Sequence, residues 1–219
     1  MKYEAVIFDF DGVLMDSGFD GFQWALKERQ KVISQHNWDL ELEKLKQGIF
    51  QPDHSEDMRE IMSQENVSWN QLRKMEKAVA ERKVEMASTG EIKIFEDAEV
   101  ILEELNCPKA VVSNAYRDYL EILLKELNIK SHMDYWTAPS LENIRNYRDR
   151  MKPEPEMVEE ALKNLGTQNA IMIGDQTTDV LAARKAGIDS IYIDRSGDKE
   201  SKANYSVTNL ANALDIIQS

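Results

Sequence analysis

The sequence is poor in cysteine and has no long hydrophobic run. Cys107 is the single cysteine among 219 residues, so no disulfide can form within the chain, which favours a reducing compartment. No segment approaches the roughly eighteen consecutive apolar residues that a membrane-spanning helix needs. Acidic residues interrupt the first apolar run almost at once, and no small-residue cleavage site follows it. We therefore expect a cytoplasmic protein without a membrane partner.

Positive charge is also scarce. The chain has 27 lysine and arginine residues against 40 aspartate and glutamate residues, which gives a formal net charge of −13. Such a surface repels the phosphates of nucleic acids and of anionic lipids, so we expect neither as a partner. An anionic substrate would need local positive charge or a metal cation in order to bind.

The rest of the composition is that of an ordinary globular protein, with 42% hydrophobic residues. Short, β-prone apolar runs alternate with segments in which apolar residues recur at helical spacing. This alternation predicts an α/β protein with a doubly wound, mostly parallel, Rossmann-like sheet. The expected strands are residues 5–8, 110–112, 170–173 and 191–193.

One long segment interrupts the alternation of strands and helices. Between residues 17 and 90 no convincing strand is present, and Leu72, Met75 and Met86 recur on one face of a helix-like stretch. We expect an all-helical domain at 17–90, inserted into an α/β core formed by residues 1–16 and 91–219.

Asp9, Asp11 and Gly12 directly follow the first expected strand. In an extended chain, residues i and i+2 point to the same side, so the carboxylates of Asp9 and Asp11 should project together. Gly12 would allow its backbone N–H to approach a bound anion. Pairs of this Asp-x-Asp type are common on protein surfaces, so the motif by itself does not establish catalysis.

A second pair of carboxylates, Asp175 and Asp179, follows the expected strand at 170–173 and opens a helix. A carboxylate at a strand end and another four residues further on can bind one cation, and hard oxygen ligands of this kind suit Mg²⁺. Alternatively, Thr177 or Thr178 caps the helix while Asp179 complements the helix dipole. That alternative does not explain Asp175.

Two further segments carry polar groups at a strand end or just before a helix, where open α/β sheets bind ligands. Lys152 precedes Pro153, which disfavours helical backbone at the lysine, so we expect a fixed positive charge at the rim of the site. Ser113 and Asn114 follow the expected strand at 110–112 with a hydroxyl and an amide. Each of these segments alone is a weak signal.

Taken together and in this order, the four motifs resemble those of the haloacid dehalogenase superfamily. The resemblance rests on the segments FDFDGVLMDS, VVSN, KPEP and GDQTTDVLAARKAG, and it spans the α/β core. The length and helicity of the 17–90 insert resemble the cap of the subfamily that includes phosphoglycolate phosphatase and β-phosphoglucomutase.

The resemblance implies a Mg²⁺-dependent phosphatase that acts on small phosphorylated metabolites through an aspartyl-phosphate. Asp9 would be the nucleophile and Asp11 the general acid and base. Mg²⁺ would be held by Asp9, Asp11, Asp175 and Asp179, and the substrate by Gly12, Ser113, Asn114 and Lys152. By the same resemblance, the presence of Asp11 argues against the dehalogenases and phosphonatases of the superfamily, whose first motif lacks it.

Two alternatives stay open. One alternative is a phosphomutase of the β-phosphoglucomutase type, for which the resemblance implies a histidine soon after the first motif and a Gly-x-x-Arg loop. Here the segment after the first motif reads SGFDGFQW and has no histidine, and residues 48–51 read GIFQ and have no arginine. The other alternative is a non-catalytic protein, either a catalytically idle scaffold or a receiver-type phosphoacceptor module, and such a module would be shorter and would lack the helical insert. We expect a monomer or small homo-oligomer, and the insert residues expected to face the substrate are Phe19, Gln23, Phe50 and Lys77.

Overall fold

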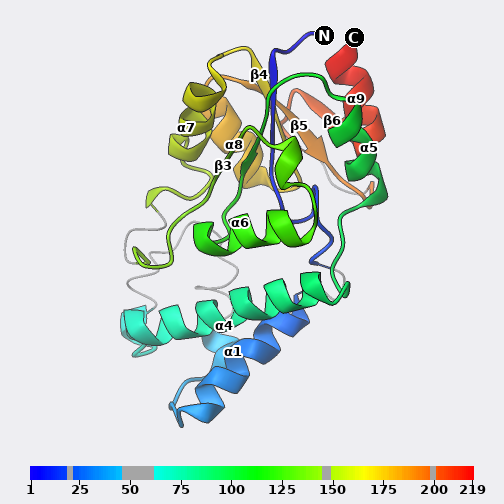
Figure 1. Ribbon diagram of the computed structural model, residues 1–219. Helices are drawn as coiled ribbons and strands as arrows, with labels where there is room; N and C mark the ends of the chain where they lie inside the picture. The colour runs from blue at the N-terminus through cyan, green and yellow to red at the C-terminus, as the bar shows by residue number, and fades with distance from the viewer. Residues whose placement is uncertain (19–21, 46–61, 145–148, 198–200) are drawn as a thin grey trace. The chain divides into compact units, whose positions relative to one another are not determined.

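The computed structural model describes residues 1–18, 22–45, 62–144, 149–197 and 201–219 (Figure 1). The chain divides into two compact units. One unit comprises Met1–Gly18 together with Val84–Ser219, and the other comprises Phe19–Lys83. We refer to them as the core unit and the helical unit.

The core unit contains a six-stranded sheet in the order β3-β2-β1-β4-β5-β6, and every adjacent pair of strands is parallel. This topology confirms the predicted doubly wound α/β fold. The two edge strands were not predicted, because both are short and only partly buried. The strands are β1 (Ala5–Phe8), β2 (Lys109–Val112), β3 (Tyr135–Thr137), β4 (Ala170–Gly174), β5 (Asp189–Ile193) and β6 (Tyr205–Val207).

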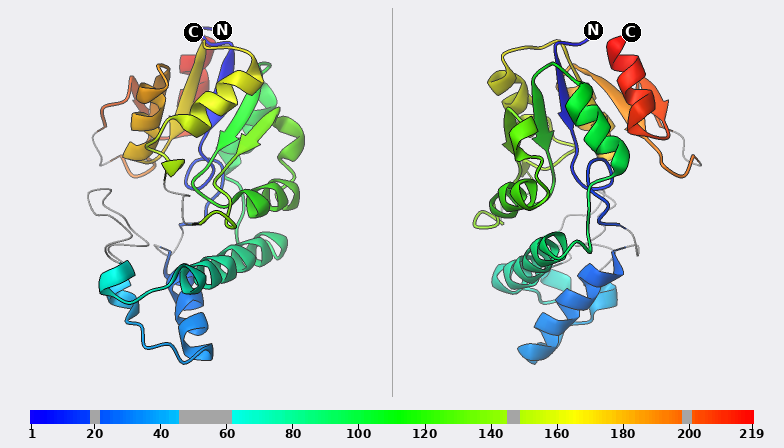
Figure 2. Two further views of the ribbon diagram at one scale, coloured as in Figure 1. Left: turned by 90° about the vertical axis from the view of Figure 1, so that its left-hand side faces the viewer. Right: turned by 45° about the vertical axis from the view of Figure 1, so that its right-hand side comes forward.

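Helices cover both faces of the sheet (Figures 1 and 2). Helices α7 (Glu156–Leu165) and α8 (Thr177–Lys185) pack against one face, where their apolar residues join Ala5 and Ile7 of β1 in one buried cluster. On the other side lie α5 (Glu96–Glu104) and α9 (Leu210–Gln218), while α6 (Arg117–Glu126) and the 3-10 helix η2 (Lys130–His132) connect β2 to β3. All four residues of β1 are buried because helices cover both of its faces.

The described part of the helical unit contains helices and no strand. Helix α1 (Gln23–Gln35) is followed by α2 (Leu42–Leu45) and by the long α4 (Trp69–Ser88), whose last turn extends past Lys83 into the core unit. An ion pair joins α1 to α4, with Nε of Arg29 2.7 Å from Oε1 of Glu76. None of the described helices is both long and apolar enough to cross a membrane.

Ile7 provides a test of the buried cluster that holds α7 and α8 to the sheet. Its side chain is fully buried, so Ile7→Ala leaves a cavity and should lower the free energy of unfolding by about 2–4 kcal/mol. Ile122 on α6 is 39% exposed, and Ile122→Ala should cost less than about 1 kcal/mol in the same urea titration. Equal losses in the two variants would contradict the described core.

Candidate active site

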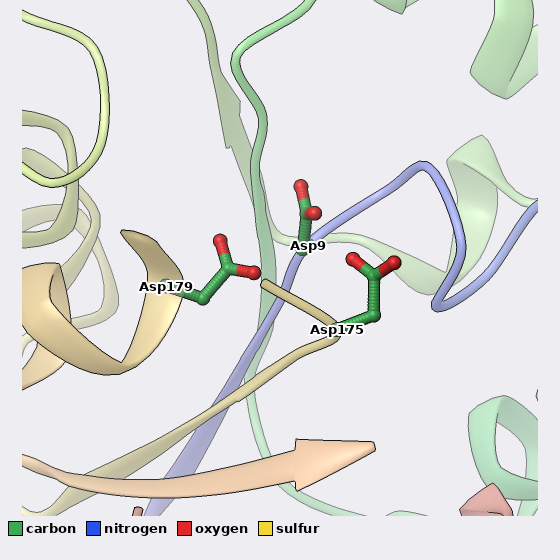
Figure 3. Close-up of side chains that lie close together, drawn as sticks. All are labelled: Asp9, Asp175 and Asp179. Atoms are coloured by element: carbon green, nitrogen blue, oxygen red, sulfur yellow. The ribbon is translucent and has the colours of Figure 1, made fainter. Parts of the chain in front are cut away.

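Two carboxylates follow neighbouring strands at one edge of the sheet. Asp9 comes directly after β1 and Asp175 directly after β4, and in this parallel pair Phe8 lies opposite Ile173. Asp179 lies in the first turn of α8. One oxygen from each of the three carboxylates lies within 4.8 Å of the other two, and Figure 3 displays the three side chains around a common space. We call Asp9, Asp175 and Asp179 the carboxylate cluster.

Two glycines make room for the carboxylate cluster. A Cβ atom on Gly174 would lie 2.2 Å from Cβ of Asp179, and a Cβ atom on Gly12 would lie 2.3 Å from Oδ2 of Asp175. Gly12 also has a φ of +77°, which side chains of other L-residues disfavour. A larger residue at either position would displace a carboxylate from the cluster.

The N–H of Gly12 makes a hydrogen bond within the chain, and its predicted contact with a bound anion stays a prediction. It donates to the carbonyl of Met15 at 2.8 Å, inside a tight turn in which Leu14 and Met15 both donate to the carbonyl of Phe10 at 3.0 Å. Gly12 therefore contributes space and a left-handed backbone to the site, while its amide holds the turn together.

Lys152 lies within the carboxylate cluster. Its side chain is only 2% exposed, which corrects the prediction of a lysine at the rim. Nζ donates to Oδ1 of Asp9 at 2.7 Å and to the carbonyl of Val112 at 2.8 Å, and it lies 2.6 Å from Oδ1 of Asp179. The contacts with Asp9 and Val112 are hydrogen bonds, and the contact with Asp179 is an ion pair. Lys152 is thus a buried counter-charge that touches two of the three carboxylates.

Asn114 holds the backbone of this lysine. Its Nδ2 donates to the carbonyl of Lys152 at 3.0 Å, and its Oδ1 accepts a hydrogen bond from the Lys152 N–H at 2.8 Å. Both ends of the Asn114 side-chain amide thus bind the backbone of Lys152, and contact of Asn114 with a substrate stays a prediction. The preceding Ser113 is buried, and its Oγ accepts a hydrogen bond from the N–H of Ala115 at 3.0 Å.

Asp11 lies in the turn after β1, close enough to the carboxylate cluster for its charge to act on Asp175. Its Oδ1 accepts a hydrogen bond from the hydroxyl of Ser17, which is fully buried. Sequence reasoning missed this serine. The available signal was its position at the end of the first motif.

Burial and the crowding of negative charge both shift the pKa values of the cluster. Burial raises the pKa of Asp9 well above its usual range, and Asp179 and Asp175 raise it further, against the lowering effect of Lys152. Burial and the charge of Asp179 raise the pKa of Asp175 to about 6. Burial alone would lower the pKa of Lys152, but the charges of Asp179 and Asp9 outweigh it and raise that pKa, so the lysine stays protonated.

These groups fit a divalent cation. Oδ1 of Asp175 is buried and has no hydrogen-bond partner among the residues that the structure describes. One ammonium group offsets only part of the charge of three carboxylates. A divalent metal ion would supply both the missing charge and a ligand contact for Asp175, and carboxylate oxygens are suitable donors for it. The other oxygen of Asp179, Oδ2, accepts a hydrogen bond from the Gln176 N–H at the start of α8, at 2.9 Å.

Residues 6–193 match the family model described as haloacid dehalogenase-like hydrolase. Since the match covers most of the chain, the protein belongs to the haloacid dehalogenase-like hydrolase family. The predicted resemblance is thereby confirmed.

The individual proteins to which the chain is similar share low sequence identity with it. A protein from Caldanaerobacter subterraneus subsp. tengcongensis, named "Putative pyrophosphatase PpaX", is 26% identical over 100% of this chain and 96% of its own length. The structure of a hydrolase from Pseudomonas syringae is similar with a TM-score of 0.69 and 21% identity, covering 99% of this chain and 100% of the other. The structure of a HAD phosphatase from Thermococcus onnurineus is similar with a TM-score of 0.65 and 19% identity, covering 98% of this chain and 97% of the other. Both structures share the fold of this protein.

Gly174→Ala should disrupt the carboxylate cluster without straining the backbone elsewhere. The new methyl group would overlap the side chain of Asp179, so the carboxylate must move away from Asp9 and Asp175. We expect Mg²⁺ to raise the melting temperature of the unmodified protein, and we expect this increase to fall sharply or vanish in the variant. An unchanged increase would show that Asp179 need not occupy its described position.

The raised pKa of Asp175 predicts how the metal-free protein responds to pH. In the folded state this pKa is about 6, above the usual value of about 3.9 for an unfolded chain. The folded state therefore binds this proton more tightly, and the associated stability, present below pH 4, is lost as the pH rises to 6. In EDTA, Asp175→Asn should be more stable than the unmodified protein at pH 7.5, by about 1–3 kcal/mol.

Urea unfolding at pH 4 and pH 7.5, with EDTA or with Mg²⁺, measures this difference. The advantage of Asp175→Asn should be absent at pH 4 and should disappear or reverse in Mg²⁺, because only the unmodified protein keeps all three carboxylates. A variant that is less stable than the unmodified protein in EDTA at pH 7.5 would contradict the charge crowding.

Proposed function

We propose that this protein is a Mg²⁺-dependent phosphatase that hydrolyses small phosphomonoesters through an aspartyl-phosphate on Asp9. The observation that carries the proposal is the setting of the buried Asp9 carboxylate. It lies 2.7 Å from the ammonium of Lys152 and within the cluster that it forms with Asp175 and Asp179. Membership of the hydrolase family, and the phosphatase and pyrophosphatase names of relatives, support phosphate chemistry.

The reaction follows from the two carboxylates after β1. Asp9 attacks phosphorus in line, the bond from phosphorus to the leaving oxygen breaks, and the phosphoryl group is held on Asp9. Asp11 gives its proton to the leaving oxygen. It then takes a proton from the water molecule that attacks the aspartyl-phosphate, which releases phosphate and restores Asp9.

The remaining residues bind the phosphoryl oxygens and the metal. The ammonium of Lys152 and the hydroxyl of Ser113 interact with the phosphoryl oxygens. Lys152 contacts the carboxylate of Asp9 directly, and Ser113 follows β2, the strand next to β1. The carboxylates of Asp9, Asp175 and Asp179 and the carbonyl of Asp11 would hold Mg²⁺. When bound, this ion supplies the positive charge that lets an anionic nucleophile approach an anionic ester.

Asp11 favours a phosphatase over other chemistries of the family. An alkoxide is a poor leaving group and needs a proton, which a carboxylic acid at this position can give. The segment SGFDGFQW has no histidine for the proton transfer expected of a phosphomutase. The loop at 48–51, which lacks the expected arginine, lies outside the described residues.

We also propose that the helical insert acts as the cap that selects the substrate. The compact helical unit spans Phe19–Lys83, inside the expected range of 17–90. Of the four insert residues expected to face the substrate, Phe19 and Phe50 lie outside the described residues. Gln23 and Lys77 are exposed, and Lys77 lies 3.6 Å from Glu81. Small phosphorylated metabolites remain the proposed substrates.

Hydrolysis of p-nitrophenyl phosphate, with and without Mg²⁺, tests the proposed function. We expect phosphate release with Mg²⁺, its loss in EDTA, and its recovery when Mg²⁺ is added in excess. A panel of sugar phosphates, phosphoglycolate and inorganic pyrophosphate then ranks the substrates. Pyrophosphate belongs in the panel because of the name of the Caldanaerobacter relative. Full activity in EDTA would contradict the proposed metal dependence.

Asp9→Asn is the matched variant for this assay. The amide keeps the shape of the side chain but removes the attacking oxygen, so turnover should fall below about 1% of the unmodified rate. Circular dichroism should verify that the fold is retained. Residual activity above this level in the folded variant would rule out Asp9 as the covalent nucleophile.

A further inference from the structure

Arg195, two residues after the end of β5, braces the turn that follows β1. Nε donates to the carbonyl of Gly12 at 3.3 Å and Nη2 donates to the carbonyl of Val13 at 2.9 Å. The guanidinium also forms a two-pronged ion pair with Asp97 of α5, at 2.9 Å and 3.1 Å. Its carbon atom lies 3.6 Å from the centre of the Phe95 ring, close enough for a cation–π contact. A planar fork of donors suits this combination, and a lysine cannot reproduce it.

Asp97 is itself fixed. Its Oδ2 accepts a hydrogen bond from the N–H of Leu210, the first residue of α9, at 2.8 Å. The N–H of Phe95 donates to the carbonyl of Leu14 at 3.0 Å, which adds a direct backbone contact between the α5 region and the turn. The arginine therefore connects the turn to two helices of the core unit.

The braced turn is the one that carries Asp11. Gly12 and Val13 are the two residues that follow it, and their carbonyls point to Arg195. Inside the turn, Gly12 N–H is bonded to Met15 and Phe10 accepts two N–H groups, so the arginine completes the hydrogen bonding on its outer side. Ser17 holds the Asp11 carboxylate from the other end of the same segment.

We infer that Arg195 is a positioning residue for Asp11: it fixes the turn at residues 10–15 so that the Asp11 carboxyl stays in place to protonate the leaving group. The inference rests on the proposed function. Arg195 acts through the carbonyls of Gly12 and Val13, and its contacts include no member of the carboxylate cluster. Its loss should therefore affect proton donation by Asp11 more than the attack by Asp9.

The quality of the leaving group separates these two effects. An alkoxide leaving from glycerol 2-phosphate needs a proton, whereas p-nitrophenolate leaves readily without one. The ratio kcat/KM reports the steps up to departure of the leaving group, so it isolates this role of Asp11. In Arg195→Lys, kcat/KM should fall by about tenfold or more for glycerol 2-phosphate but by less than about threefold for p-nitrophenyl phosphate.

Three further variants complete the experiment. Asp11→Asn should show the same selectivity with a larger loss. Asp97→Asn removes the charge that pairs with Arg195, and it should show the same selective loss of kcat/KM for glycerol 2-phosphate to a smaller extent. If Arg195→Lys does not fold, the result for Asp97→Asn tests the inference. Arg184→Gln is the matched control, because Arg184 donates to the carbonyl of Lys202 at 2.9 Å, away from the turn, and should change neither ratio. Equal losses for the two esters, or no loss for either, would overturn the inference.

Hydrogen exchange gives a readout that needs no activity. Backbone amides in a peptide covering residues 10–15 should exchange faster in Arg195→Lys than in the unmodified protein, while residues 170–174 of β4 should be unaffected. If the unmodified protein hydrolyses neither ester, the proposed function fails, and the bracing by Arg195 is judged on this exchange alone. Unchanged exchange at residues 10–15 would overturn the bracing.

Discussion

The buried ammonium of Lys152 among three carboxylates is the interaction on which the rest of the site depends. Lys152 contacts Asp9 and Asp179 directly, and removing one partner of such a buried pair costs about 3–5 kcal/mol because the other charge is left uncompensated. Its single charge does not balance the three carboxylates, and burial together with this excess of negative charge raises the pKa values of Asp9 and Asp175. The fold thus tolerates an electrostatic imbalance that a bound divalent cation would relieve. The carboxylate cluster therefore lowers the stability of the folded protein at the site where the proposed reaction needs negative charge.

The parallel sheet explains why residues so far apart in sequence meet at one point. Strands β2, β1 and β4 are adjacent and parallel, so their carboxyl ends lie at the same edge and deliver Ser113, Asp9 and Asp175. Gly12 and Gly174 leave the space that the carboxylates of Asp175 and Asp179 occupy. Gly174 ends β4 and leaves space for Asp179, so the strand end and the following helix can approach each other closely.

The sequence was sufficient for the core fold and for the carboxylate cluster, because both rest on local signals. Buried strands appear in the sequence as short apolar runs, and Asp9 and Asp175 directly follow two of these runs, while Asp179 lies in the first turn of the helix that comes next. The edge strands β3 and β6 lack this signal, being short and partly exposed. The role of Asn114 was not readable either, since its partner Lys152 is 38 residues away and only the fold brings them together. Arg195 was missed for the same reason, because Asp97 and the carbonyls of Gly12 and Val13 that it binds are far from it in sequence, and backbone carbonyls carry no sequence signature.

Two separate networks support the two carboxylates that follow β1. Asp9 is held from the side of β2, through Lys152, whose ammonium is anchored on the Val112 carbonyl and whose backbone is held by Asn114. Asp11 is held by Ser17 and by a turn that Arg195 braces from the side of β5. A nucleophile must be ionised and a general acid must be protonated, so two carboxylates two residues apart need different surroundings. Because the two networks share no residue, a substitution in one of them can change the surroundings of one carboxylate while those of the other stay the same. The alternation of side chains along an extended chain predicts that Asp9 and Asp11 point to the same side, and their different partners beyond the strand suit the two different roles that we propose for them.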